Sequence, residues 1–84
     1  MKSKKDIILL GSTGSIGESA LRLIRENRDK FNLIGVSAHN NVRLLSEIVN
    51  EFDVPNVVLS NATYAKDYFG KNELNVGPIH LSRV

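Results

Sequence analysis

A glycine-rich turn near the N-terminus limits the possible folds of this chain more than any other feature. Residues 11–17 read Gly-Ser-Thr-Gly-Ser-Ile-Gly, with a glycine at every third position. The apolar run Ile-Ile-Leu-Leu at residues 7–10 precedes the turn, and an amphipathic segment follows it. A strand, a glycine-rich turn and a helix in this order are typical of the first βα unit of a nucleotide-binding sheet.

Each glycine of the turn has a predicted task. Gly11 lets the chain leave the strand in a backbone conformation that other residues resist. Gly14 has no side chain, so the backbone and a pyrophosphate can approach each other closely. Gly17 lets the helix pack tightly on the strand.

The start of the helix is the predicted anion site. The free N–H groups of residues 13–16 point outward at the positive end of the helix dipole, where negative charge is favoured. Ser12, Thr13 and Ser15 are expected to add hydroxyl donors. The candidate cofactor-binding residues of the turn are Thr13, Gly14, Ser15 and Ile16.

The alternative is a glycine-rich turn that packs tightly and binds nothing. Its position between a strand and an amphipathic helix favours binding, because that is the context in which the motif works. A P-loop is unsupported, because no Lys-Ser or Lys-Thr pair follows the last glycine.

Strands and helices are expected to alternate along the whole chain. Residues 7–10 are short, apolar and β-branched, so we expect a strand buried on both faces. The first helix is expected to bury an apolar stripe of Ile16, Ala20, Leu23 and Ile24. The expected strands are residues 7–10, 31–38, 57–59 and 74–76, and the expected helices are 15–27, 42–52 and 62–69. Asn41 and Asn61 are the predicted caps of the last two helices, and residues 77–78 form a turn.

This β-α-β-α-β-α order predicts the α/β class, with a parallel sheet and right-handed crossovers. The corresponding fold is a Rossmann-like, doubly wound sheet of which only the N-terminal β-α-β-α-β-α part is present. Residues 79–84 show no closing element, so we expect residues 1–84 to be the N-terminal part of a dinucleotide-binding domain, with catalytic and C-terminal domains absent.

Length and composition limit the number of domains and exclude several classes of protein. With 84 residues there is room for one small domain, and 42% hydrophobic and 24% charged residues are ordinary globular values. The absence of cysteine excludes disulfides and thiolate metal sites. A net charge of +2 is too small to indicate nucleic acid, and no apolar run is long enough for a secretory signal or a membrane span. We therefore expect a cytoplasmic protein that binds neither nucleic acid nor membrane.

The end of the second predicted strand indicates which dinucleotide is bound. Units that bind NAD place an acidic residue about 20 residues past the glycines to hold the ribose 2′-hydroxyl. Here no acid occurs between Asp29 and Glu47; residues 37–41 read Ser-Ala-His-Asn-Asn, with Arg43 close by. Neutral donors and one cation tolerate a 2′-phosphate, so NADP is favoured over NAD. Alternatively, Asn41 is only a helix cap, His39 an exposed loop residue and Arg43 a solvated helix residue.

No catalytic or metal site is predicted within the chain. It contains no paired carboxylates, no metal-ligand cluster and no nucleophile with a base. His80 is a lone histidine in an unpatterned tail and receives no role.

Two stretches carry a resemblance to a known family. Residues 8–17 (ILLGSTGSIG) followed by 21–27 (LRLIREN), together with residues 33–42 (LIGVSAHNNV), resemble the N-terminus of the 1-deoxy-D-xylulose 5-phosphate reductoisomerase family. The resemblance covers about residues 6–60 and fades beyond them. All seven positions of the glycine turn match, which is more specific than a generic glycine fingerprint.

The resemblance implies an activity for the intact protein. Members of the family convert 1-deoxy-D-xylulose 5-phosphate, a sugar phosphate, to 2-C-methyl-D-erythritol 4-phosphate in the non-mevalonate isoprenoid pathway. They use NADPH and a divalent metal, Mg²⁺ or Mn²⁺, whose ligands lie downstream of the region matched here. The resemblance further implies a homodimeric oxidoreductase as the intact enzyme, and an 84-residue segment that is inactive alone.

Site residues follow from the same resemblance. It places Thr13, Gly14, Ser15 and Ile16 against the NADPH phosphates, and residues 39–41 (His39, Asn40 and Asn41) at the adenosine end. Many members have Gly followed by Lys or Arg where this chain has His39 and Asn40. One expected cation is therefore missing, and Arg43 is positioned to compensate.

Two other functions fit the glycine turn. One is another NADP-dependent reductase, such as a semialdehyde dehydrogenase, although those enzymes usually vary the Ser-Thr-Gly-Ser core. The other is a stand-alone nucleotide-binding module without catalysis, which requires the gene to end near Val84.

Overall fold

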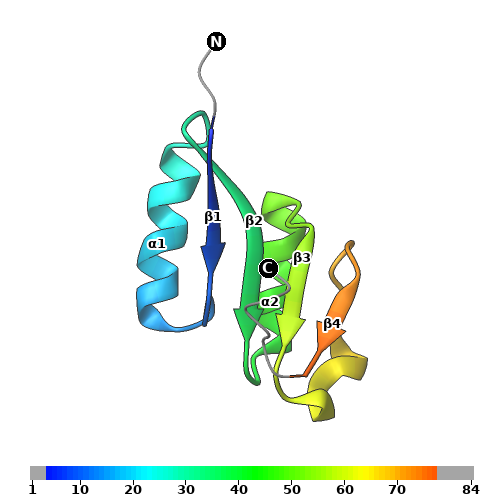
Figure 1. Ribbon diagram of the computed structural model, residues 1–84. Helices are drawn as coiled ribbons and strands as arrows, with labels where there is room; N and C mark the ends of the chain where they lie inside the picture. Colours follow the sequence, from blue (N-terminus) through cyan, green and yellow to red (C-terminus); the bar gives the residue numbers. More distant parts are fainter. Residues whose placement is uncertain (1–3, 78–84) are drawn as a thin grey trace.

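The structure, a computed structural model, describes residues 4–77 and contains one four-stranded parallel sheet with the strand order β1-β2-β3-β4 (Figure 1). The elements are β1 (Lys5–Leu9), α1 (Ser15–Glu26), β2 (Phe31–Ala38), α2 (Val42–Phe52), β3 (Asn56–Leu59), the 3₁₀ helix η1 (Ala62–Asp67) and β4 (Leu74–Val76). The predicted Rossmann-like α/β alternation and all four predicted strands are confirmed.

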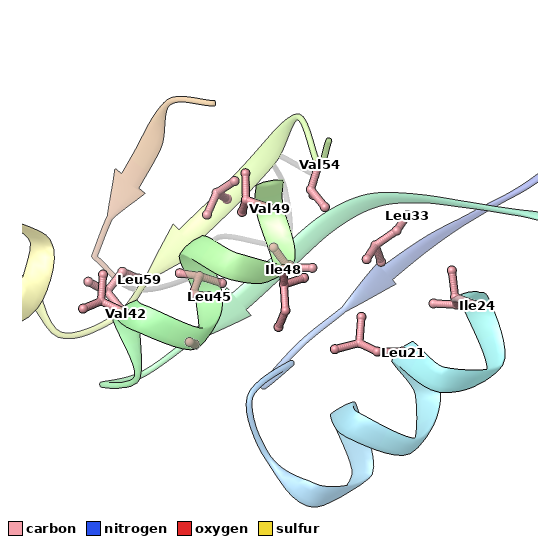
Figure 2. Close-up of a cluster of buried hydrophobic side chains, with 12 residues drawn as sticks. Leu21, Ile24, Leu33, Val42, Leu45, Ile48, Val49, Val54 and Leu59 are labelled. Atoms are coloured by element: carbon pink, nitrogen blue, oxygen red, sulfur yellow. The ribbon is translucent and has the colours of Figure 1, made fainter. Parts of the chain in front are cut away.

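One buried cluster holds the two long helices on the sheet. It includes Leu21 and Ile24 of α1, Leu45 and Val49 of α2, and apolar residues of β2 and β3 (Figure 2). Such a cluster is the principal source of stability in a domain of this size. The helices also meet at the surface, where Arg25 of α1 forms an ion pair with Glu51 of α2. The helices therefore lie side by side on one face of the sheet.

Parallel strands bring their following loops to one edge. Leu9 is paired with Val36, Ala38 with Leu59, and Leu59 with Val76, so the strands end near the same level. The glycine turn, residues 39–41 and residues 60–61 therefore follow one another along the carboxyl edge of the sheet. This is the edge at which open α/β sheets bind ligands.

The first strand is not buried on both faces, and that prediction was wrong. The side chains of Ile8 and Leu10 are 43% and 55% exposed. The reason is that α1 and α2 both lie on one face of the sheet: Ile7 and Leu9 pack against the core there, whereas Ile8 points to the opposite face, which nothing within residues 4–77 covers.

The predicted apolar stripe of α1 was wrong at two positions. Ile16 is 84% and Leu23 55% exposed, and the buried face of the helix is instead formed by Gly17, Leu21 and Ile24. Gly17 belongs to the buried face although it has no side chain, because the helix packs closely against Ser12 at this position.

The last predicted helix is shorter than residues 62–69 and is a 3₁₀ helix. Tyr68 leaves the helix in an extended conformation, and its hydroxyl donates to the carbonyl of Asn72 at 2.6 Å. The next backbone amide, that of Phe69, donates to the buried hydroxyl of Ser46 in α2 at 3.0 Å. Pro78 of the predicted turn, His80 and the rest of the tail lie outside the described residues.

Candidate functional site

The glycine turn is tied to the next strand by three hydrogen bonds to one serine. The amide of Gly11 donates to Ser37 Oγ at 3.0 Å. The amide and the hydroxyl of Ser12 both donate to the carbonyl oxygen of Ser37, at 2.8 and 2.9 Å. Gly11 has a φ of +67°, so its predicted special conformation is confirmed. The turn is thus fixed rigidly to the carboxyl end of β2.

This arrangement corrects the prediction for two hydroxyls. Ser12 is only 1% exposed and its hydroxyl already donates to Ser37, so it is not a donor for a ligand. Ser37 was grouped with the neutral donors around the second strand, yet it is buried and its oxygens accept bonds from the turn. Both serines shape the turn.

Gly17 has no room for a side chain. A Cβ atom there would lie 2.5 Å from the carbonyl oxygen, 2.6 Å from the carbonyl carbon and 2.8 Å from the Cα of Ser12. The need for glycine at this position is confirmed, but the helix packs here against the turn rather than against the strand. Ser12 cannot move aside easily, because Ser37 holds it twice.

Gly14 differs, because the described residues leave open space around it. Its φ of −82° and ψ of 176° are ordinary extended values. A Cβ atom would contact only the carbonyl oxygen of Gly11, at 3.6 Å. Packing within the described part of the chain therefore does not require glycine at position 14. A ligand that approached the backbone closely at this point would require it.

The first turn of α1 carries free backbone donors. The amide of Gly14 donates to the carbonyl of Gly11 at 3.2 Å, so the prediction that it is free was wrong. The amides of Thr13, Ser15 and Ile16 have no acceptor among residues 4–77. Gly14, the N-cap, provides no side-chain cap. These amides lie at the positive end of the helix dipole, so the position favours an anion.

A cleft lies beside these amides. It has a volume of about 400 Å³ and is lined by Leu9, Leu10, Gly11, Gly14, Ser15, Ile16 and Gly17. The cleft thus has free backbone N–H groups and exposed apolar side chains next to each other. This combination suits a phosphate group attached to a larger organic ligand.

The loop after β2 exposes all three of its predicted site residues, His39, Asn40 and Asn41. Asn41 caps α2 as predicted, because its Oδ1 accepts from the amide of Leu44 at 3.1 Å. Asn40 Oδ1 accepts from Asn61 Nδ2 at 2.8 Å, a contact that the sequence did not indicate. The structure therefore places the predicted residues 13–16 and 39–41 at the ends of neighbouring strands.

Arg43, the nearest predicted cation, lies in the first turn of α2 and is largely exposed. Its Nε is 3.7 Å from Glu47 Oε2, one helical turn away. An exposed pair of this kind contributes little to stability, so the guanidinium can exchange partners at small cost.

A cluster of charged and aromatic side chains links the two long helices away from this edge. Arg25 donates two hydrogen bonds to Glu51, and the guanidinium groups of Arg25 and Arg28 lie over the ring of Phe52. The hydrogen bond from Arg25 lowers the pKa of Glu51. This cluster links α1 to α2 and is structural.

Residues 4–77 contain neither a metal-ligand cluster nor a membrane-spanning helix. No three His, Asp or Glu side chains within this range are grouped to hold a metal ion. None of the helices described has the length and apolar character needed to cross a bilayer.

Comparison with known proteins gives consistent matches. The family profile of 1-deoxy-D-xylulose 5-phosphate reductoisomerase matches residues 7–78. The reductoisomerase of Thermoanaerobacter sp. (strain X514) is 50% identical over 54 residues, which are 64% of this chain and 14% of that protein. The reductoisomerase of Microcystis aeruginosa is 40% identical over 79 residues, which are 93% of this chain and 20% of that protein.

A solved structure agrees with the sequence matches. The reductoisomerase from Zymomonas mobilis, in complex with NADPH, superposes with a TM-score of 0.82 and 28% sequence identity. The match covers 89% of this chain and 21% of that chain. The present chain thus spans at most about a fifth of the length of these three relatives.

Proposed function

Because this chain belongs to the 1-deoxy-D-xylulose 5-phosphate reductoisomerase family, we propose that residues 1–84 form the N-terminal part of the NADPH-binding domain of such an enzyme. Three free amides at the start of α1, beside the open space at Gly14, carry this proposal. The solved relative in complex with NADPH supports the choice of ligand.

Each part of the cofactor has residues that fit it. The amides of Thr13, Ser15 and Ile16 hold the pyrophosphate, and Gly14 allows the close approach. His39, Asn40 and Asn41 lie one strand further along and take the adenosine end. The backbone amides are fixed by the helix and by Ser37, so they need little rearrangement to meet the ligand.

Preference for NADPH over NADH follows from the loop after β2. The residues exposed there are neutral or basic, with Arg43 within the next helical turn. An acid at the end of β2 would select the free ribose hydroxyl of NADH, and none is present. Arg43 replaces the cation that many relatives carry in the loop.

The whole enzyme would reduce and rearrange 1-deoxy-D-xylulose 5-phosphate to 2-C-methyl-D-erythritol 4-phosphate. NADPH supplies the hydride when bound, and this chain's residues bind and orient it. No group of three His, Asp or Glu side chains that could hold a metal ion lies within residues 4–77. We propose that the divalent metal, Mg²⁺ or Mn²⁺, is held by residues outside this chain. We further propose a cytoplasmic homodimer that takes the sugar phosphate as its substrate and binds neither nucleic acid nor membrane.

The test is calorimetric titration of the full-length protein with NADPH and with NADH, followed by turnover with 1-deoxy-D-xylulose 5-phosphate and Mg²⁺ or Mn²⁺. Tighter binding of NADPH together with turnover is expected. Binding of NADPH without turnover would favour the stand-alone nucleotide-binding module. Turnover of a semialdehyde instead would favour the other class of reductase, and no binding of either nucleotide would contradict the proposal.

A further inference from the structure

Asn61, the second residue after β3, connects its own segment to the loop after β2 and to η1. Its amide donates to the carbonyl of His39 at 3.0 Å. Its Nδ2 donates to Asn40 Oδ1 at 2.8 Å, and its Oδ1 accepts from the amide of Thr63 at 3.1 Å. One side chain thus caps η1 and holds the loop after β2.

These contacts fix the orientation of both side-chain amides. A backbone N–H only donates, so the atom of Asn61 that faces Thr63 must be Oδ1. The other end of the same amide, Nδ2, then faces Asn40 and can only donate. Asn40 must therefore turn its Oδ1 toward Asn61, which leaves its Nδ2 pointing away.

The NH₂ group of Asn40 is thereby presented as a donor. Its Nδ2 has no acceptor among residues 4–77, and its side chain is exposed in the loop that we assign to the adenosine end of the ligand. An amide NH₂ suits an acceptor such as a phosphate, whereas the opposite orientation would direct an oxygen at it.

We propose that Asn61 is a positioning residue for cofactor specificity, which holds the Asn40 amide with its NH₂ group toward the 2′-phosphate of NADPH. This inference rests on the proposed function. Without Asn61, both orientations of the Asn40 amide become accessible, and the unfavourable one opposes the phosphate. NADH has no 2′-phosphate, so its affinity does not depend on this orientation.

Asn61→Ser in the full-length protein is the direct test. A serine hydroxyl can still accept from the amide of Thr63, and the backbone bond to His39 is retained, but the contact with Asn40 is lost. The dissociation constant for NADPH is expected to rise by roughly 2- to 6-fold, because freeing the Asn40 side chain between two amide orientations and about three χ1 rotamers lowers the fraction that is oriented for binding. The dissociation constant for NADH should not change.

A second variant is expected to reverse the orientation of the Asn40 side-chain amide, whereas Asn61→Ser only leaves it free to rotate. Asn61→Asp can also cap η1, but its second carboxylate oxygen requires a donor, so Asn40 must turn its NH₂ inward. This variant should weaken NADPH binding more than Asn61→Ser does. Asn50→Ser is the matched control, because Asn50 lies near the C-terminal end of α2, away from the loop that precedes the helix, and its side chain contacts the backbone of Phe69 and Lys71. It should leave the ratio of the NADPH and NADH affinities unchanged.

A double-mutant cycle shows whether Asn61 acts through Asn40. Asn40→Ala should weaken NADPH binding, and adding Asn61→Ser to it should weaken binding no further. Equal weakening of NADPH and NADH by Asn61→Ser, full additivity in the cycle, or an unchanged NADPH affinity in both Asn61 variants would overturn the inference and leave the proposed function standing. Failure of the wild-type protein to bind NADPH would overturn both.

Discussion

Gly14 and Gly17 lie one helical turn apart, and replacing each with Ala separates ligand binding from folding. For Gly14→Ala, the backbone is ordinary and the new Cβ contacts only Gly11 O at 3.6 Å. Alanine reduces the entropy of the unfolded chain, which stabilises by about 0.4–1 kcal/mol, but it is a poorer N-cap than glycine by a similar amount. The free energy of unfolding should therefore stay within about 1 kcal/mol of wild type.

Binding should respond differently in this variant. The methyl group occupies the space in which a pyrophosphate would contact the first turn of α1. Loss of two hydrogen bonds to a charged group costs about 3–6 kcal/mol. The affinity for NADPH should then fall by roughly 100-fold or more.

Gly17→Ala should instead damage the fold. Its Cβ would lie 2.5–2.8 Å from three backbone atoms of Ser12, which two hydrogen bonds to Ser37 hold in place. Such overpacking costs about 1–3 kcal/mol. Denaturant unfolding and calorimetric titration with NADPH, on both variants of the full-length protein, measure the two effects. Wild-type affinity in Gly14→Ala, or a loss of stability as large as that of Gly17→Ala, would refute this reasoning.

Three further predictions concern specificity, pH dependence and activity. His39→Asp should reduce the preference for NADPH over NADH, because a carboxylate at the end of β2 repels a 2′-phosphate; the ratio of the two dissociation constants measures this, and an unchanged ratio would count against the assignment of the loop. Glu51→Gln should destabilise the fold by less than about 1 kcal/mol at neutral pH, since the pair with Arg25 is partly solvent-exposed. Because hydrogen bonding lowers the folded-state pKa of Glu51, this difference should be present above the usual value of 4.5 and disappear as the pH falls through the folded-state pKa, which unfolding curves at several pH values test; a difference that persists in acid would contradict it. The isolated segment 1–84 should show no turnover with substrate, NADPH and Mg²⁺ or Mn²⁺; consumption of NADPH would place the catalytic residues within it.

The element order and the glycine turn could be predicted from the sequence because their signals are local. Apolar runs mark the strands, and Asn41 precedes a helix whose amide it caps. Gly11 and Gly17 follow from the spacing of the turn, and both are required by the backbone as observed.

The missed features depend on contacts between distant residues. The sequence suggests that Ser12 has an exposed hydroxyl in a turn. Only its hydrogen bond to Ser37, 25 residues later, shows that this hydroxyl is already bonded and is not free for a ligand. The link between Asn61 and Asn40 spans 21 residues and needs the parallel register of β2 and β3. The exposure of Ile8 depends on which face of the sheet the helices cover, and local periodicity does not encode that.

The crystal structure of the full-length protein with NADPH tests the central claim most directly. We expect pyrophosphate oxygens about 2.7–3.2 Å from at least two of the backbone nitrogens of Thr13, Ser15 and Ile16, with the adenosine 2′-phosphate beside Asn40. A pyrophosphate bound elsewhere, with the first turn of α1 facing only solvent, would contradict it.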